Sequence, residues 1–456
     1  MASMSDGGID YYADAGTVDA SSIADVAAVA ARKALTQDGD FLVLALVGMP
    51  ARGKSFIGAK LRSFLRWSGL NVRVFNAGKR RRRMSTPQQQ HHKAAFFDAA
   101  NSGARDARER IAMETLDALF AYFESGEGEV GIFDATNSTK ERRAAILERA
   151  RRRFAPSGKT CGVVFVETIC DDPHVLEANM LTKVRNSPDF EGMDEAAALT
   201  DLKQRTAHYE AAYESLEDGE GASYIKLYNF SSKVTCSLCY GRVTRVVLPF
   251  LMAVHVDERP IYLVAIAPRA GEAEYAGDVD ADHDAVLGAR LNAWCEALPA
   301  PPSVVFASTA PGAYAVAEGF VDGAAVVHRS DLDPFFNDPA HPWPSAHRDL
   351  AARLENVLID IEASVAPTLV ITHATPARAL RAFFLDKADV KVVEESATTE
   401  GPRALAGSKY AVVEIMATVA GGYSENVHLL DAGEDTPSRR PSVSRRKSTP
   451  WHAPRS

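Results

Sequence analysis

Short apolar runs alternate with longer amphipathic segments along the first half of the chain. The clearest run is FLVLALV at Phe41–Val47, which is continuous and is bounded by Gly48. Such a run is typical of a strand buried on both faces of a parallel sheet. Strands alternating with helices predict a parallel α/β sheet with helices on both faces. We predict further strands at Asn71–Phe75, Val130–Phe133, Cys161–Glu167 and Tyr224–Leu227, helices at Ser55–Trp67, Ala104–Glu124, Lys140–Phe154, Pro173–Lys183 and Glu195–Leu216, and a basic loop at Lys79–His92.

The alternation starts again near Val254–Pro260, which indicates a second α/β domain. Both ends of the chain, by contrast, have compositions that cannot build a core. We therefore predict a disordered or linker N-terminus (1–38), a first domain (39–257), a second domain (258–432) and a disordered basic tail (433–456). In the second domain we predict strands at Ile261–Ile266, Val304–Ala307, Thr368–Thr372 and Lys409–Met416, and helices at Asp284–Leu298, Ala346–Ala363 and Pro376–Leu385.

Composition and charge narrow the class of protein. The 456 residues carry a net charge of −9, and residues 439–456 alone contribute +6, so the rest of the chain sums to −15 (−9 minus +6). An acidic body of this kind argues against nucleic-acid binding. No apolar run reaches 18 residues and the N-terminus is acidic, so we expect a cytoplasmic protein without a membrane partner. Five cysteines are too few for a disulfide scaffold, and the lone pair Cys236 and Cys239 leaves zinc or redox chemistry as a minor alternative.

The sharpest motif directly follows the first predicted strand. It reads G-x-x-x-x-G-K-S, a full nucleotide-binding P-loop placed between a strand and a helix. In such a loop, backbone N–H groups wrap a phosphate, the lysine neutralises the β- and γ-phosphates, and the serine hydroxyl binds Mg²⁺. The residues are Gly48, Met49, Pro50, Ala51, Arg52, Gly53, Lys54 and Ser55.

A nucleotide site of this type needs a second acid at the end of a neighbouring strand. Asp134 follows the predicted strand Val130–Phe133 and is the candidate for holding Mg²⁺ with Ser55. Asp134 could instead cap the next helix, since the segment after it is rich in capping side chains. Arginine clusters suited to a phosphorylated acceptor follow in the same half, starting with the run at Lys79–Arg83.

Six motifs in order resemble the kinase domain of the 6-phosphofructo-2-kinase/fructose-2,6-bisphosphatase family: GMPARGKS, VRVFNAGKRRR, GIFDATNSTKERR, FVETICDDP, NMLTKVRNSPDF and Arg205-x-x-x-Tyr209. The resemblance implies phosphorylation of the 2-hydroxyl of fructose 6-phosphate by ATP with Mg²⁺. It also implies sugar-phosphate contacts by Arg81, Arg108, Thr136, Arg142, Arg205 and Tyr209, catalytic roles for Lys54 and Asp134, and nucleotide contacts by Asn179 and Lys183.

The motifs leave the roles of two positions in the first domain open, Cys170 and Val184. The family's cysteine near the site matches Cys170, although in-line phosphoryl transfer requires no nucleophilic thiol and a buried apolar role is equally open. The family's lysine five residues after the position of Asn179 is replaced here by Val184, with Lys183 and Arg185 as neighbours that could substitute for it. One residue rotates a helical side chain by about 100°, so the contact depends on the fold.

The second domain resembles the family's histidine phosphatase but departs from its motifs. A nucleophilic histidine, phosphate-binding cations and an acid are required for that chemistry. The matching stretch is Arg269-Ala270-Gly271-Glu272, with alanine at the nucleophile's place. An alignment without the extra residues before this stretch puts Ile266 there instead, and His283 is a conceivable substitute nucleophile. Gly312 and Ser345 stand where an arginine and an acid are expected, and His373 alone is retained. We predict a folded but inactive phosphatase domain; a bifunctional enzyme and a non-catalytic sugar-phosphate-binding protein are the alternatives.

The basic tail contains two serines that each follow a pair of arginines, Ser442 and Ser448. This pattern is a recognition sequence for basophilic protein kinases, and phosphorylation would lower the tail's charge by about 1.5 to 2 units per site. An unmodified solubilising tail is the alternative. The sequence also leaves a homodimer open.

Overall fold

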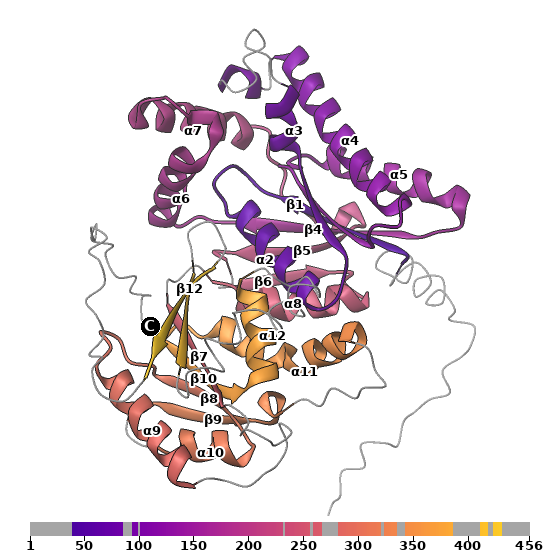
Figure 1. The fold of residues 1–456 in the computed structure, drawn as a ribbon. Helices are drawn as coiled ribbons and strands as arrows, with labels where there is room; N and C mark the ends of the chain where they lie inside the picture. The colour runs from indigo at the N-terminus through magenta and orange to yellow at the C-terminus, as the bar shows by residue number, and fades with distance from the viewer. Residues whose placement is uncertain are drawn as a thin grey trace, which may run out of the picture.

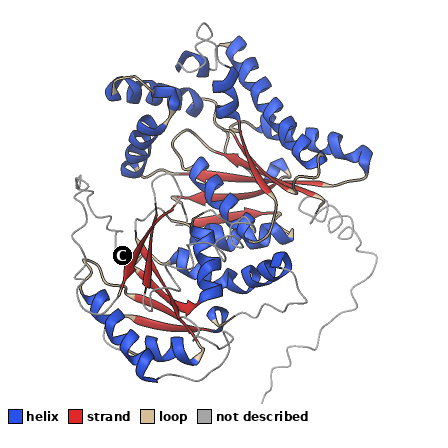
Figure 2. Cartoon of the chain, viewed as in Figure 1, coloured by secondary structure: helices blue, strands red, loops and turns tan. Residues whose placement is uncertain are grey.

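The computed structural model describes residues 39–84, 94–98, 101–230, 233–255, 259–266, 281–320, 323–334, 343–385, 411–417 and 423–430. These residues form two six-stranded sheets, each covered by helices on both faces (Figures 1 and 2). The predicted α/β fold class is confirmed. The predicted segments 1–38 and 433–456 lie outside the described residues, and the domain boundaries stay predictions.

The first sheet has the order β2-β3-β1-β4-β5-β6, and only β6 runs antiparallel. β1 occupies the centre because all seven of its residues are apolar and buried. The parallel pairing places the carboxyl ends of β1, β3 and β4 at one edge, where ligands bind in open α/β sheets. The strands are β1 (Phe41–Val47), β2 (Val72–Asn76), β3 (Val130–Asp134), β4 (Cys161–Ile169), β5 (Ser223–Tyr228) and β6 (Lys233–Ser237).

Helices cover the first sheet in two layers. Odd positions of β1, such as Val43, pack against α4 and α5, whereas even positions, such as Leu44, pack against α2 and α8. α6 and α7 stand beyond the strand ends (Figure 1). The helices are α2 (Lys54–Trp67), α3 (Ala77–Met84), α4 (Ser102–Glu124), α5 (Lys140–Phe154), α6 (Pro173–Asn186), α7 (Glu195–Glu210) and α8 (Arg242–Ala253), with short 3₁₀ turns that include η1 (Ala94–Phe97) and η3 (Pro188–Phe190).

The second sheet has the order β12-β11-β7-β10-β8-β9, with β11 and β12 antiparallel to their neighbours. α9 and α10 cover its outer face, and α11 and α12 cover the face toward the first domain (Figure 1). The elements are β7 (Pro260–Ile266), α9 (Ala281–Glu296), β8 (Val304–Ser308), α10 (Pro311–Ala317), β9 (Ala325–Arg329), α11 (Trp343–Ala363), β10 (Thr368–His373), α12 (Ala374–Phe384), β11 (Ala411–Ala417) and β12 (Tyr423–Leu429).

One hydrophobic core joins the two domains through α2, α8, α11 and α12. The rings of Phe64 and Phe250 stack with centroids 4.1 Å apart, and Trp67 packs edge-on against Phe383 at 5.8 Å. The indole N–H of Trp67 donates to the carbonyl oxygen of Ala379 over 2.8 Å. Helix α2, which follows the predicted P-loop, is therefore held by both domains.

A buried ion pair crosses the same interface. Lys60 of α2 is 3% exposed, and its ammonium lies 3.3 Å from the carboxylate of Glu362 on α11, which is 2% exposed. The hydroxyl of Tyr423 on β12 bonds to both groups, and the ammonium also lies 4.1 Å from the Tyr423 ring centroid. Three elements of the two domains thus satisfy one buried charge.

Most predicted elements are found within three residues of their expected bounds, but two predictions were wrong. Part of the expected basic loop at Lys79–His92 is helix α3, which begins where the Asn76 side chain accepts from the Lys79 N–H at 2.7 Å. The helix expected to reach Leu216 ends at Glu210, because the backbone N–H of Glu214 turns to bond with the Ser138 carbonyl at 2.8 Å. The pattern also missed β6, α8, α10, β9 and β12.

Candidate active site

The segment Gly48–Ser55 forms the turn from β1 into α2. Gly48 has φ +142°, and a Cβ there would lie 2.8 Å from the carbonyl oxygen of Thr168. Gly53 has φ +86°, and a Cβ there would lie 2.9 Å from the Phe230 ring. Both positions therefore require glycine, which allows a tight turn at the N-terminus of α2. A turn of this kind can bind phosphate through its backbone N–H groups.

The intervening residues Met49, Pro50, Ala51 and Arg52 complete the loop, with Ala51 also at a positive φ of 60°. The carbonyl oxygen of Met49 accepts from the Lys54 ammonium over 2.6 Å. This bond holds the lysine side chain back along the loop, where the phosphates of a nucleotide would lie.

Asp134 lies at the end of β3, beside β1, and is 6% exposed. One of its carboxylate oxygens accepts from the Ser55 hydroxyl over 3.0 Å and from the Asn76 side-chain amide. The alternative capping role falls to Thr139, whose hydroxyl accepts from the Arg142 N–H at the start of α5. A carboxylate and a hydroxyl side by side are the hard oxygen ligands that Mg²⁺ prefers, so Ser55 and Asp134 could hold that ion.

The charges around the loop fit an anionic ligand. Loss of hydration and the neighbouring charges of Lys183 and Arg52 together lower the pKa of Lys54 to about 7, although the charge of Asp134 opposes the shift. Loss of hydration likewise lowers the pKa of Lys183. The buried Nδ2 of Asn179 has no hydrogen-bond partner among the described residues. A bound nucleotide phosphate would pair with these two poorly hydrated ammonium groups and accept a hydrogen bond from the amide.

Helix α6 shows which neighbour of Val184 could replace the family's lysine. Val184 is 7% exposed and packs with Phe190 and Leu202 in a small core between α6 and α7. Arg185 points away from the loop and pairs with Glu195 at 2.7 Å and 3.0 Å. Lys183 faces the site, because the charges of both Asp134 and Asp189 act on its ammonium. Of the two neighbours that could replace the family's lysine, the fold therefore favours Lys183.

A cluster of arginines lies across the site from the loop. Arg81 of α3 and Arg205 of α7 are 8% and 5% exposed. Both donate to the same carboxylate oxygen of Asp189, Arg205 over 3.0 Å. The Phe97 ring lies beneath both guanidinium groups, at 5.1 Å from Arg81 and 4.9 Å from Arg205. Two predicted substrate-binding positions, far apart in the sequence, thus share one anchor.

The other predicted sugar-phosphate positions lie around this cluster. Tyr209 packs against Phe97 with centroids 5.8 Å apart, and its hydroxyl interacts electrostatically with Arg108. Arg142 also interacts with Arg108 and pairs with Glu109 on α4. Thr136 lies at the loop itself, where its carbonyl oxygen accepts from the Gly48 N–H over 3.0 Å. The fold therefore brings all six predicted positions to one edge of the first sheet.

Cys170 follows β4, and its side chain is 5% exposed. Burial raises the pKa of its thiol, which argues against a thiolate nucleophile. Its carbonyl oxygen accepts from a guanidinium nitrogen of Arg52. The contact with the nucleotide loop is thus made by the backbone of Cys170.

Sequence reasoning missed three residues of the site. Asp189 joins the arginines, Phe97 supports them, and Asn76 orients Asp134. Asp189 stood within the quoted NMLTKVRNSPDF motif, so its signal was present without a role. Phe97 carried no signal, since a phenylalanine in a short segment reads equally well as core.

The carboxyl end of the second sheet holds His373, which is 9% exposed. Its Nε2 lies 3.2 Å from the Ser308 hydroxyl, which in turn donates to Asp333 over 2.7 Å. Because Ser308 gives its proton to Asp333, His373 Nε2 must be the donor to Ser308. Thr309 adds two further bonds to Asp333, each 2.7 Å long. Burial lowers the pKa of His373 to about 4, so the ring is neutral at pH 7.

The remaining predicted positions are only partly described. Gly312 lies in α10, and Ser345 lies in α11 with a side chain outside the described set. Arg269, Ala270, Ser442 and Ser448 lie outside the described residues. Within the described ranges, no helix is both long and apolar enough to cross a membrane. The same ranges contain no cluster of three histidine, cysteine or acidic side chains suited to a metal ion.

Together, the loop, the neighbouring acid and the arginine cluster define a P-loop α/β protein with a second α/β domain. The 6-phosphofructo-2-kinase family model matches residues 31–258, half of the chain, and the chain belongs to this family. The resemblance drawn from the motifs is thus confirmed.

Full-length relatives support the assignment. The chain is similar to the 6-phosphofructo-2-kinase/fructose-2,6-bisphosphatase of Aquarana catesbeiana, at 31% identity over 76% of this chain and 78% of the relative. The Arabidopsis thaliana protein of the same name is 31% identical over 92% of this chain and 57% of its own length. The 6-phosphofructo-2-kinase 1 of Saccharomyces cerevisiae is 38% identical over 52% of this chain and 28% of its own length. The chain thus spans about half and about a quarter of these last two relatives.

Proposed function

We propose that the chain transfers the γ-phosphoryl group of ATP, with Mg²⁺, to the 2-hydroxyl of fructose 6-phosphate, giving fructose 2,6-bisphosphate. One observation carries the proposal. The Lys183 ammonium is within electrostatic reach of both Asp134, beside the nucleotide loop, and Asp189, in the arginine cluster. A cation within reach of both donor and acceptor is well placed to stabilise the charge on a transferred phosphoryl group.

The nucleotide half binds and orients the donor. The loop N–H groups and the N-terminus of α2 bind the phosphates, Lys54 neutralises their charge, and the Asn179 amide donates to the nucleotide. Mg²⁺, when bound, supplies positive charge that polarises the transferred phosphoryl group. Ser55 and Asp134 would hold the ion, and Asn76, which donates to the Asp134 carboxylate, would keep that carboxylate in place.

The acceptor half binds the sugar by its 6-phosphate. Arg81 and Arg205 grip that phosphate, since a guanidinium can donate two parallel N–H bonds. Arg108, Arg142 and Tyr209 border the sugar. Asp134 also orients the acceptor hydroxyl. Most of the rate enhancement then comes from fixed positions and charges, because phosphoryl transfer needs little covalent help.

We further propose that the second domain does not hydrolyse the product. His373 is neutral and its Nε2 is hydrogen-bonded to Ser308, so it cannot serve as a cationic phosphate contact. The Ser308 hydroxyl, the Thr309 N–H and the Thr309 hydroxyl all donate to Asp333, so these three donors are not available to a phosphate oxygen. A bifunctional enzyme remains the alternative that the names of the relatives favour. A cytoplasmic location, a homodimer and tail phosphorylation stay predictions.

Paired assays on one preparation test both proposals. Purified protein with MgATP and fructose 6-phosphate should form an acid-labile bisphosphate, and failure to form it would exclude the kinase in favour of a non-catalytic binding protein. The same preparation should release no phosphate from fructose 2,6-bisphosphate. Phosphate release that is lost in His373→Ala would instead establish a bifunctional enzyme.

A further inference from the structure

Asp189 lies in η3, the short turn between α6 and α7, and its side chain is 8% exposed. Its carboxylate receives Arg81 and Arg205 on one oxygen, while Arg82 lies 3.5 Å from the other. Ser187 supports the turn by accepting from the Asp189 N–H over 3.3 Å. Three guanidinium groups from two helices thus meet at a single acid.

The arginines are also held from their other sides. Arg205 lies between two rings, 4.9 Å from the centroid of Phe97 and 4.7 Å from that of Phe190, and it pairs with Asp201 over 2.6 Å. Arg81 shares the Phe97 ring. A guanidinium has five N–H donors, so an arginine that gives one or two to a carboxylate can still bind a phosphate. The cluster therefore resembles a preformed receptor.

Electrostatics explain why an acid is needed there. Burial alone would raise the pKa of Asp189, but the charges of Arg81 and Arg205 outweigh that effect and lower it, so the carboxylate is ionised at neutral pH. Without it, the buried guanidinium groups would repel one another and separate. The spacing of Arg81 and Arg205 thus depends on Asp189.

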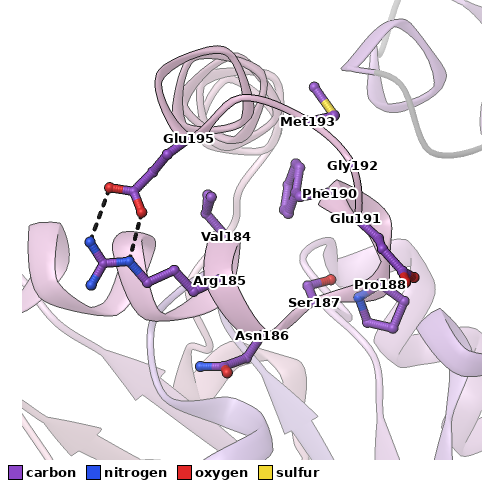
Figure 3. A pocket seen from close by; sticks show the side chains of 10 residues that line it. All are labelled: Val184, Arg185, Asn186, Ser187, Pro188, Phe190, Glu191, Gly192, Met193 and Glu195. Carbon is purple, nitrogen blue, oxygen red and sulfur yellow. Dashed lines mark hydrogen bonds and ion pairs between the residues drawn. The ribbon is translucent and has the colours of Figure 1, made fainter.

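The turn that carries Asp189 is open on its opposite face. A cavity of about 480 Å³ lies there, bordered by Val184, Phe190 and Met193 and by the exposed Arg185–Glu195 pair (Figure 3). An open face gives little packing resistance to movement of the turn. The ion pairs of Asp189 therefore help to set its position, together with the packing of Phe190 against Val184 and Leu202.

We propose that Asp189 is a positioning residue that sets the spacing of Arg81 and Arg205 for the 6-phosphate of the acceptor sugar. The inference rests on the proposed function, since it assigns the arginines to that phosphate. It makes a prediction with a definite sign. As a mere counter-charge, Asp189 would repel an anionic substrate, and its removal would tighten binding. As a positioning residue, its removal weakens binding.

The test compares Asp189→Asn with Glu195→Gln, which removes an exposed carboxylate at the same corner of the fold. KM for fructose 6-phosphate should rise roughly 10- to 100-fold in Asp189→Asn, the scale of a lost charge-assisted bond, while KM for ATP changes by less than about twofold. Glu195→Gln should leave both values unchanged. Asp189→Glu, which restores the charge on a longer side chain, should recover part of the sugar affinity.

Direct binding of fructose 6-phosphate, measured by calorimetry, separates the inference from the proposed function. If the unaltered protein neither binds the sugar phosphate nor turns it over, the proposed function fails and the inference with it. If the unaltered protein does both, an unchanged or lowered KM for the sugar in Asp189→Asn overturns the inference alone. Equal increases in both KM values would also overturn it, since they would indicate a general loss of structure.

Discussion

The two domains place polar groups at the same location, the carboxyl edge of a mainly parallel sheet, but complete them differently. In the first domain, Lys54 and Lys183 lie close together with lowered pKa values, and the Nδ2 of Asn179 lacks a partner among the described residues. In the second domain, His373, Ser308 and Asp333 satisfy one another.

The difference indicates what each edge is for. Buried polar groups without hydrogen-bond or charge partners destabilise the free protein, and a ligand that supplies those partners binds more tightly as a result. Groups whose hydrogen-bonding capacity the protein has already filled offer a ligand little. The first edge has the properties of a binding site and the second those of a core.

The largest expected effect concerns Lys54. Lys54→Ala should lower kcat for the bisphosphate product by about 10³-fold or more, because it removes the loop's charge-stabilising donor. The exposed Lys203 on α7 provides a matched control, and Lys203→Ala should retain full activity. Rates would be followed as ATP-dependent product formation, with circular dichroism to verify the fold. Normal turnover in Lys54→Ala would remove the functional contrast between the two edges.

The second effect concerns the shared interface. Lys60→Met leaves Glu362 charged and buried, which should lower the free energy of unfolding by about 3–5 kcal/mol. The double variant Lys60→Met/Glu362→Leu should regain most of that loss, because no unpaired charge remains. Urea unfolding would measure both. Two separate transitions in the unaltered protein would indicate that the domains are energetically independent, against the single core seen here.

A smaller effect is a pH dependence of nucleotide binding. Lys54 has a lowered pKa of about 7, and a bound triphosphate should raise it, so binding takes up a proton above pH 7. Affinity for MgATP should therefore fall by up to about tenfold per pH unit from pH 7 upward, until the pKa of the bound form is reached. Lys183, Arg52 and Asp134 share this field and broaden the transition.

Calorimetry in buffers of different ionisation enthalpy would detect that proton uptake. Lys54→Arg is the control, since arginine stays charged throughout the range and should bind with little pH dependence. Affinity that is constant from pH 7 to 9 in the unaltered protein would show that Lys54 remains charged without nucleotide. The sign for stability is opposite. The ligand-free protein should become more stable as pH rises from 7, because a neutral Lys54 is not destabilised by the loss of hydration that burial imposes on the charged form.

The smallest expected effect concerns His373. His373→Asn should leave kinase turnover unchanged and lower the free energy of unfolding by only about 1 kcal/mol, the value of one buried hydrogen bond. Steady-state kinetics and thermal unfolding would measure the two quantities. A kinase rate that fell severalfold would mean that the second edge communicates with the first, and the contrast between an active and a passive edge would need revision.

Local signals predicted the loop and Asp134 because a strand, a glycine turn and a helix lie next to one another in the sequence. The arginine helix α3 was missed because its charges read as solvent-exposed, whereas Glu114 and Asp189 pair with them in the fold. The role of Asp189 depends on its contacts with α3 and α7, which are far apart in the sequence, and no local sequence pattern predicts that these helices lie together. The exchange at Val184 became clear only once α6 was seen to continue to Asn186 and bury that residue.

The shared core can be completed only after most of the second domain has been translated. Phe250 is made 134 residues before Phe384 of α12 (384 minus 250), so the first domain emerges with its α2 and α8 faces uncovered. At about 5–20 residues per second, translation leaves that apolar surface exposed for roughly 7–27 s. Apolar surface that is exposed in this way favours aggregation, and a slow codon stretch between the two halves would lengthen the exposure.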